Sequence, residues 1–329
     1  MILWMLPALT GCRGDTTDTV DSGSPDSPWE IAADLVPGGV MLSAWTETAT
    51  DEVLIVGGAL DKPSGTLWRY DGTSLCFEEG AADQPLWWIH GRGPGEWIAV
   101  GAKGAVLRES AGVRIRDDIP TEATLFGVYD DDSEVWVVAG DIYASTGEVW
   151  RQPEGGDWEK VADLPDLMFK VWEDWLVGAG QAYQWDGSKL VDQFPEGARR
   201  FMTVRGAGDD LWAVGDGLNQ SEVHKWSEGA WSSPELDPRC TGQGLNGVWT
   251  DQGEDVWVAG FFGAMARFNG SDWDCPSAPL TSEHFHAAWR WHDETLFVGG
   301  NFFAPSGHYG TLGRHGGVGP VQVQPCGTR

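Results

Sequence analysis

Two histidines that stand two positions apart are the clearest candidates for chemistry at a metal ion. His284 and His286 fall in a predicted strand that lines a central channel. Alternate side chains of a strand share a face, so both imidazoles could reach one ion. No third ligand has a fixed spacing from them, and a polar lining that bonds water and backbone explains the pair without an ion. The sequence therefore predicts no metal and no cofactor.

Other catalytic signatures are weak. Asp130, Asp131 and Asp132 resemble a calcium run but lack the glycine and the ligand spacing of a calcium loop. The chain has no HExxH, no phosphate-binding loop and no G-x-S-x-G. A glycosidase or lyase would need convergent carboxylates, or a Tyr/His/Arg set, for which Asp141, Asp216 and His286 are the candidates. Since no spacing brings these three together, no catalytic residue is assigned.

The elements that would position such residues belong to a repeat. A short apolar strand that ends in glycine recurs seven times, at intervals of about 40 residues, the length of a propeller blade. The final glycines are Gly58, Gly101, Gly140, Gly178, Gly215, Gly260 and Gly300. Glycine at this position permits the turn into the next loop without a steric penalty.

Two further columns keep the same register. A large side chain precedes each glycine, in a column of Trp45, Trp88, Tyr129, Trp172, Arg205, Trp249 and Trp289. We interpret this column as core between neighbouring wedges rather than as a carbohydrate platform. DG and NG pairs after each glycine indicate hairpin turns. Each unit then has four antiparallel strands, A to D, and the chain is predicted to be an all-β, seven-bladed β-propeller.

The units resemble the tryptophan-rich propeller repeats of bacterial exported lipoproteins. The segments LNGVW (245–249), EDVWVAG (254–260) and ARFNGSDW (266–273) carry this resemblance, which extends over roughly residues 29–325. It implies the fold and an exported location, and it assigns no activity.

Ring closure has two candidates. WEIAADL (29–35) matches WEKVADL (158–164) in a strand-D position, so the N-terminal strand is expected to complete the last blade. The alternative is that PVQVQP (320–325) supplies that strand.

The N-terminus resembles a lipoprotein signal. An apolar run ends in Leu9-Thr10-Gly11-Cys12, which is similar to the bacterial lipobox. The resemblance implies that residues 1–11 are a signal peptide, that Cys12 carries palmitate-type acyl chains, and that 12–28 form a disordered tether to a propeller over 29–329. Because Arg13 rather than Asp follows Cys12, the outer membrane or cell surface is expected.

The net charge and the loop residues indicate which classes of binding partner the protein could have. The chain has 50 Asp and Glu against 21 Lys and Arg, a net charge of −29, which disfavours nucleic acid. The B–C loops of the last two blades form a candidate ligand face for a protein or glycan partner. The alternative is that their aromatic rings fold back as local core. The residues of this candidate face are Phe261, Phe262, Phe302, Phe303, His308 and Tyr309. We therefore expect a lipid-anchored, non-enzymatic binding or scaffold protein, with a glycan-active enzyme as the alternative.

Two disulfides and a set of ion pairs are expected. Besides Cys12 there are four cysteines, which favour the disulfides Cys240–Cys275 and Cys76–Cys326 in an exported protein. Strand C also carries a basic column, and each member is expected to pair with the acidic residue of its own A–B turn. The basic residues are Arg69, Arg108, Arg151, Lys225, Arg267 and Arg314. Their expected partners are Asp51 or Glu52, Glu96, Glu134, Asp210, Asp255 and Glu294, in that order.

Overall fold

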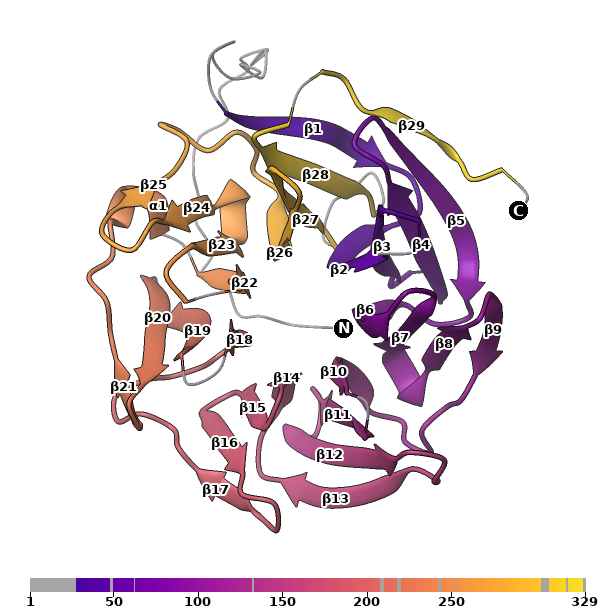
Figure 1. Cartoon of the computed structure of the whole chain (residues 1–329), viewed down its shortest axis with the longest axis vertical. Coiled ribbons are helices and arrows are strands. Elements are labelled where there is room, and N and C mark those ends of the chain that lie inside the picture. Colours follow the sequence, from indigo (N-terminus) through magenta and orange to yellow (C-terminus); the bar gives the residue numbers. More distant parts are fainter. Residues whose placement is uncertain are drawn as a thin grey trace.

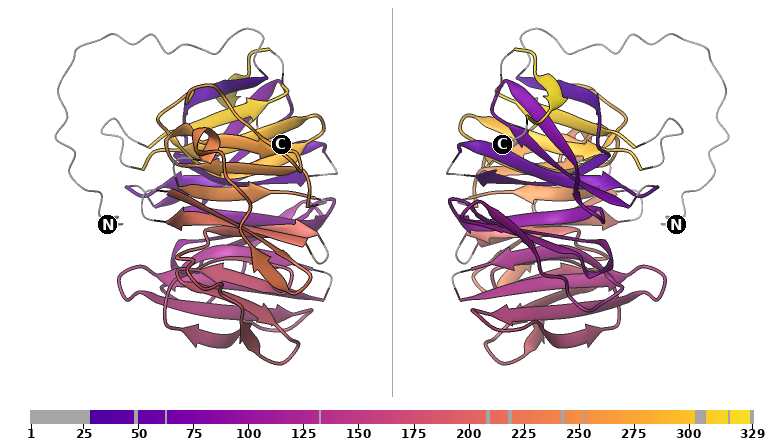
Figure 2. Two further views of the ribbon diagram at one scale, coloured as in Figure 1. Left: turned by 90° about the vertical axis from the view of Figure 1, so that its left-hand side faces the viewer. Right: turned by 90° about the vertical axis from the view of Figure 1, so that its right-hand side faces the viewer.

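Seven sheets stand around a central axis in the computed structural model (Figure 1). The structure describes residues 28–47, 50–61, 63–131, 133–207, 210–217, 220–241, 244–251, 253–302, 308–317 and 319–327. Seen from the sides, the strands run across the thickness of a disc (Figure 2). The predicted seven-bladed propeller of four-stranded antiparallel blades is confirmed.

Blades 1 to 4 follow one another along the chain. In each blade, strand A lies nearest the axis and strand D lies at the rim (Figure 1). The strands are, in blade 1, β2 (Val40–Glu47), β3 (Glu52–Ala59), β4 (Ser64–Tyr70) and β5 (Ser74–Ala82); in blade 2, β6 (Leu86–Gly93), β7 (Glu96–Gly101), β8 (Val106–Ser110) and β9 (Val113–Arg116); in blade 3, β10 (Thr124–Asp130), β11 (Glu134–Asp141), β12 (Thr146–Pro153) and β13 (Glu159–Leu164); and in blade 4, β14 (Met168–Trp172), β15 (Trp175–Gly178), β16 (Gln181–Trp185) and β17 (Leu190–Asp192).

Blades 5 to 7 complete the ring, together with two strands from the ends of the described chain. The strands are, in blade 5, β18 (Thr203–Ala207), β19 (Asp210–Gly217), β20 (Gln220–Ser227) and β21 (Ala230–Ser232); in blade 6, β22 (Leu245–Trp249), β23 (Val256–Gly260), β24 (Met265–Phe268) and β25 (Trp273–Asp274); in blade 7, β26 (His284–Trp291), β27 (Glu294–Gly300), β28 (Gly310–His315) and β1 (Trp29–Val36); and, added to blade 1, β29 (Gln322–Pro325). We call the side that carries the A–B turns the A–B face, and the opposite side the B–C face.

Helical segments are short. The described residues contain α1 (Pro238–Thr241) and the 3-10 turns η1 (Ala102–Gly104) and η2 (Phe261–Gly263). Among these residues, no helix has the length and apolar character that a membrane span requires.

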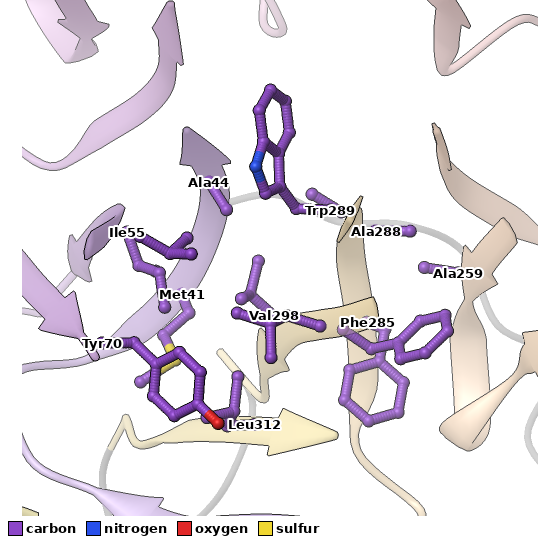
Figure 3. Packing of buried hydrophobic residues seen from close by; sticks show 14 of the residues in the cluster. Met41, Ala44, Ile55, Tyr70, Ala259, Phe285, Ala288, Trp289, Val298 and Leu312 are labelled. Atoms are coloured by element: carbon purple, nitrogen blue, oxygen red, sulfur yellow. The ribbon is translucent and has the colours of Figure 1, made fainter. Parts of the chain in front are cut away.

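The core lies between adjacent blades, because each sheet buries both faces against its neighbours. Figure 3 shows the junction of blades 7 and 1, where Met41 and Ile55 lie close to Val298 and Leu312. All four of these side chains are fully or almost fully buried. The repeated glycines serve this packing through close approach. A Cβ at Gly215 would lie 1.8 Å from the carbonyl oxygen of Arg200, and one at Gly178 would lie 2.0 Å from that of Leu167.

The N-terminal strand closes the ring. β1 pairs antiparallel with β28 and becomes strand D of blade 7, as expected from its match to 158–164. The alternative, in which the C-terminal segment supplies that strand, is wrong. Because β1 already occupies the edge of β28, β29 continues past it and pairs in parallel with β5 as a fifth strand of blade 1.

Both expected disulfides are present. Cys76 in β5 bonds Cys326, just after β29, with a Cα–Cα distance of 4.8 Å. Cys240 in α1 bonds Cys275, which follows β25, at 5.4 Å. The first bond fastens the end of the chain to blade 1, and the second fastens the linker between blades 5 and 6 to the rim of blade 6.

Four of the six cations contact the acid of their own A–B turn. The nitrogen to oxygen distances are 3.3 Å for Arg69–Glu52, 3.7 Å for Arg151–Glu134, 3.0 Å for Lys225–Asp210 and 2.7 Å for Arg267–Asp255. Three of these cations also lie over the strand-B tryptophan opposite them: Trp136, Trp212 and Trp257.

The other two expected pairs are wrong. Arg108 bonds Asp117 at 3.1 Å, because its expected partner Glu96 accepts a hydrogen bond from Ser110 and lies 3.8 Å from Arg92.

Arg314 is fully buried and bonds Glu30 of β1 at 2.5 Å. Its contact with Glu294 is indirect, because it donates to the Tyr70 hydroxyl at 3.2 Å, and that hydroxyl donates to Glu294 at 2.8 Å. Arg314 therefore ties β1, blade 7 and blade 1 together.

The two disulfides should differ in their effect on stability. They join residues that are 250 and 35 positions apart, and chain entropy makes the longer loop more stabilising by about 1–2 kcal/mol. Cys76→Ser with Cys326→Ser should therefore lower the free energy of unfolding more than Cys240→Ser with Cys275→Ser. Urea denaturation of both double variants measures this, and an equal or reversed order would contradict it.

Candidate binding site

The inner strands place one ring of side chains at the A–B end of the channel. Strand pairing makes seven residues equivalent, one from each blade: Trp45, His90, Tyr129, Trp172, Arg205, Trp249 and Trp289. The sequence assignment of Trp88 to this column is wrong, because His90 is the residue that pairs with Ile98, which in turn pairs with the strand-C cation Arg108. We call these residues the mouth ring.

Members of the mouth ring pack on one another around the axis. Ring centroids lie 5.4 Å apart for Trp45 and Trp289, 4.8 Å for Trp45 and His90, 4.7 Å for His90 and Tyr129, and 5.3 Å for Tyr129 and Trp172. His90 Nδ1 accepts a hydrogen bond from the Asp130 backbone N–H. Burial, with help from the charge of Arg205, lowers the pKa of His90 to about 3, so its imidazole is neutral at pH 7.

A second aromatic layer lies toward the B–C face. Trp87, Phe126 and Phe169 follow one another around the axis, and Phe302 lies between Trp87 and His286. Beneath this layer, Lys170 donates to the carbonyl of Phe126 at 2.7 Å and lies 4.2 Å from the ring centre of Trp88. Burial lowers the pKa of Lys170 to about 7.

The two candidate metal-binding histidines have different contacts. His286 faces Phe302, and burial lowers its pKa to about 3. His284 packs against the rings of Phe261 and Phe262, and its Nδ1 accepts from the Phe262 backbone N–H. Within the described part of the chain, no three His, Cys, Asp or Glu side chains are grouped as metal ligands would be.

The candidate ligand face has a mixed outcome. Phe302 packs inward, and His308 lies 3.2 Å from Asp61. Phe262 is 44% exposed in a left-handed conformation, with φ of 55°. Tyr309 is half-buried, and Phe303 lies outside the described residues.

The candidate catalytic residues belong to three different blades. Asp141 in blade 3 accepts hydrogen bonds from the backbone N–H groups of Tyr143 and Ala144. Asp216 in blade 5 pairs with Arg200 at 3.3 Å. His286 is in blade 7, so these side chains serve separate local structures.

A notch in the A–B face lies over blade 4. The four strands of this blade have 5, 4, 5 and 3 residues, whereas those of blade 3 have 7, 8, 8 and 6. Its A–B turn consists of only Glu173 and Asp174, between the paired Trp172 and Trp175. Because blade 4 is shorter than its neighbour, a space of about 520 Å³ remains. We call this space the notch.

Aromatic rings and carboxylates line the notch together. The lining residues are Tyr129, Asp131, Glu134, Trp136, Glu173, Asp174, Trp175, Gln184, Trp185, Leu211 and Trp226. The rings form two pairs, Trp136 with Trp185 at 5.2 Å and Trp175 with Trp226 at 4.7 Å. The lining contains four carboxylates and no Lys or Arg, although Arg151 pairs with Glu134 from outside it.

Hydrogen bonds from neighbouring side chains hold two of the carboxylates. Glu134 accepts from the Trp136 indole N–H at 2.8 Å, and Asp174 accepts from Gln184 at 2.9 Å. Burial and the charge of Asp174 raise the pKa of Glu173. Burial and the neighbouring charge of Glu173 also raise the pKa of Tyr129 to about 12, so this phenol stays protonated. The notch therefore combines aromatic side chains and carboxylates in one concave space.

Sequence reasoning missed this site. The sequence feature that could have indicated the notch is the short fourth repeat. In the segment VWEDWLVG (171–178), only Glu173 and Asp174 separate two tryptophans.

Comparison with known proteins supports the fold. No family model matches the chain, and no curated protein matches it. Among solved structures, "YCF48 bound to D1 peptide" is 14% identical with a TM-score of 0.63, covering 89% of this chain and 98% of that one. YCF48 from Cyanidioschyzon merolae is 14% identical with a TM-score of 0.62, over 87% and 98%. Virginiamycin B lyase from Staphylococcus aureus is 12% identical with a TM-score of 0.60, over 84% and 94%. At such identities, the likeness concerns the fold alone.

Proposed function

We propose that this chain is an exported, lipid-anchored, non-enzymatic binding protein whose notch receives a cationic segment of a protein partner. The observation that carries the proposal is the notch itself, where four carboxylates and five aromatic side chains line one concave space.

The chemistry of the lining selects the ligand. Lys and Arg side chains are attracted to the faces of Trp and Tyr by about 0.5–2 kcal/mol, and carboxylates add hydrogen-bonded charge pairs. The net charge of −29 also accelerates encounter with a basic partner and disfavours an acidic one.

A protein ligand is favoured over a glycan by the arrangement of charge. Carboxylates can also accept hydrogen bonds from sugar hydroxyls, but a cationic side chain gains charge pairing with the four carboxylates that a neutral glycan does not. A structural neighbour is described as bound to a peptide, which is consistent with peptide binding by a propeller of this shape.

The anchor rests on the lipobox-like Leu9-Thr10-Gly11-Cys12, which lies outside the described residues. An acylated Cys12 followed by a polar tether would hold the propeller at the outer membrane or cell surface.

Neutralising the notch should weaken binding of a basic peptide. For amidated pentalysine and the full-length protein, Glu173→Gln with Asp174→Asn should reduce the affinity at least about tenfold, since two charge-assisted contacts are lost. Trp185→Leu should reduce it about threefold or more through the loss of cation–π attraction. Calorimetric titration measures both.

The matched control is Glu122→Gln with Glu196→Gln, which removes the same charge from two exposed linker positions. This control should change the affinity less than about twofold. Equal effects of the two double variants would show that only net charge matters and would refute the notch. Because the pKa of Glu173 is raised above its ordinary 4.5, affinity should begin to fall at a pH above 4.5 as the solution is acidified.

Removing the lipid attachment residue should release the protein from the membrane. Cys12→Ala is expected to leave an unacylated precursor that moves from the detergent phase to the aqueous phase in detergent phase separation. Cys326→Ser, which changes a cysteine in the folded domain, should still partition into detergent. Unchanged partitioning of Cys12→Ala would contradict the anchor.

A further inference from the structure

Arg205 is the single cation of the mouth ring, and three tryptophans surround it. Its guanidinium carbon lies 4.5 Å from the ring centre of Trp172, 5.4 Å from that of Trp249 and 4.5 Å from that of Trp289. These rings come from blades 4, 6 and 7, so the side chain extends across the channel mouth from blade 5.

The contacts of Arg205 leave most of its donors unused. Its Nε donates to the carbonyl of Thr250 at 3.1 Å. Within the described residues, no carboxylate lies within 4.0 Å of its guanidinium. Its two terminal nitrogens make no hydrogen bond there either. By contrast, the strand-C cations Arg69, Arg108, Arg151, Lys225, Arg267 and Arg314 each contact a carboxylate.

The same corner of the ring has a buried donor without a partner. Trp249 is 6% exposed, and its buried indole N–H has no acceptor among the described residues. The corner between β18 and β22 thus holds donors without a close acceptor, and the carboxylate of Asp251 acts on Arg205 only from more than 4.0 Å away. An unpaired buried donor is destabilising, and an acceptor supplied from outside would remove part of that cost.

A carboxylate fits this corner better than a phosphate does. A guanidinium with both terminal nitrogens free presents a fork that matches the two oxygens of a carboxylate. Tryptophan walls exclude water and strengthen the charge pair. A dianion would be opposed by Asp131 and Glu173, which lie near enough to Tyr129 to raise its pKa, and Tyr129 is itself part of the ring.

The corner and the notch adjoin. Tyr129 lines the notch and packs on Trp172 at 5.3 Å, while Arg205 lies 4.5 Å from the ring of Trp172. One aromatic side chain therefore separates the cation-binding notch from the guanidinium.

We infer that Arg205 forms a carboxylate subsite at the channel mouth, so that the ligand of the A–B face carries a carboxylate beside its cationic group. This inference rests on the notch as the proposed cation site. A chain-terminal lysine has both groups in one residue, and an internal Glu-Lys pair has them in two.

Three peptides separate these sources. They are acetyl-Gly-Gly-Gly-Lys with a free C-terminus, the same peptide amidated, and amidated acetyl-Gly-Gly-Glu-Lys. The full-length protein should bind the free acid, the Glu-Lys amide, or both at least about tenfold more tightly than the plain amide. A preference for the free acid assigns the carboxylate to a chain terminus, and a preference for the Glu-Lys peptide assigns it to an acidic side chain.

Variants of Arg205 test its role. Arg205→Met should abolish the preference for a peptide that carries a carboxylate. Arg205→Lys should retain part of it, because the charge remains but the fork is lost. Arg199→Met, which removes an exposed cation from the linker that precedes β18, is the control and should keep the full preference. Unchanged circular dichroism and melting temperature verify that each variant folds. If Arg205→Met does not fold, the partial preference expected of Arg205→Lys tests the role of Arg205.

Two results would overturn the inference in distinguishable ways. If the plain amide binds but no peptide is preferred, the notch stands and the carboxylate subsite is refuted. If no peptide binds, the proposed function fails, and acetate alone decides the subsite. Saturable acetate-dependent shifts of the indole N–H resonances, absent in Arg205→Met and not reproduced by chloride, would support it; no saturable response would refute it.

Discussion

Closure of the ring is the constraint on which the rest of this structure depends. Seven wedges surround an axis only when the last packs on the first, and here the strand that completes blade 7 comes from the opposite end of the described chain. Arg314 secures that junction, because it is fully buried and bonds Glu30 of β1 and Tyr70 of blade 1. A lone buried guanidinium would be strongly destabilising, so these partners make closure all-or-none. The disulfide from Cys76 to Cys326 fastens a fifth strand over the same junction.

Once the ring is closed, function depends on where the blades differ. Equivalent positions of strand A meet at the axis, so a change in one repeat stands beside the aromatic side chains of the other six. Arg205 takes an aromatic position in blade 5 and brings a cation among tryptophans. The short strands of blade 4 open the notch beside it. Departures from the repeat thus place opposite charges on either side of Trp172.

The sequence predicted the features that recur in every blade, but it did not predict those that arise where a single blade differs from the repeat. Glycine-ended strands predicted seven blades, and the likeness of 29–35 to 158–164 predicted which terminus closes the ring. Four ion pairs also followed from strand register. The place of His90 in the mouth ring did not, because blade 2 has a tryptophan, Trp88, two positions before the residue that is in register, and the search followed the residue type. The contact of Arg314 with Tyr70 crosses between blades and needs three-dimensional packing. The notch arises from missing length, which pattern searches for chemical groups do not detect.

Hydrogen–deuterium exchange of the full-length protein, with and without a saturating lysine-terminated peptide, tests the central claim most directly, because it locates the ligand without any substitution. Binding at the A–B face should slow exchange in 129–136, 171–185 and 205–226, the segments that carry the notch and Arg205. The B–C loops around Phe262 and His308 should exchange at unchanged rates. Protection confined to those B–C loops, or spread evenly over all seven blades, would contradict the account.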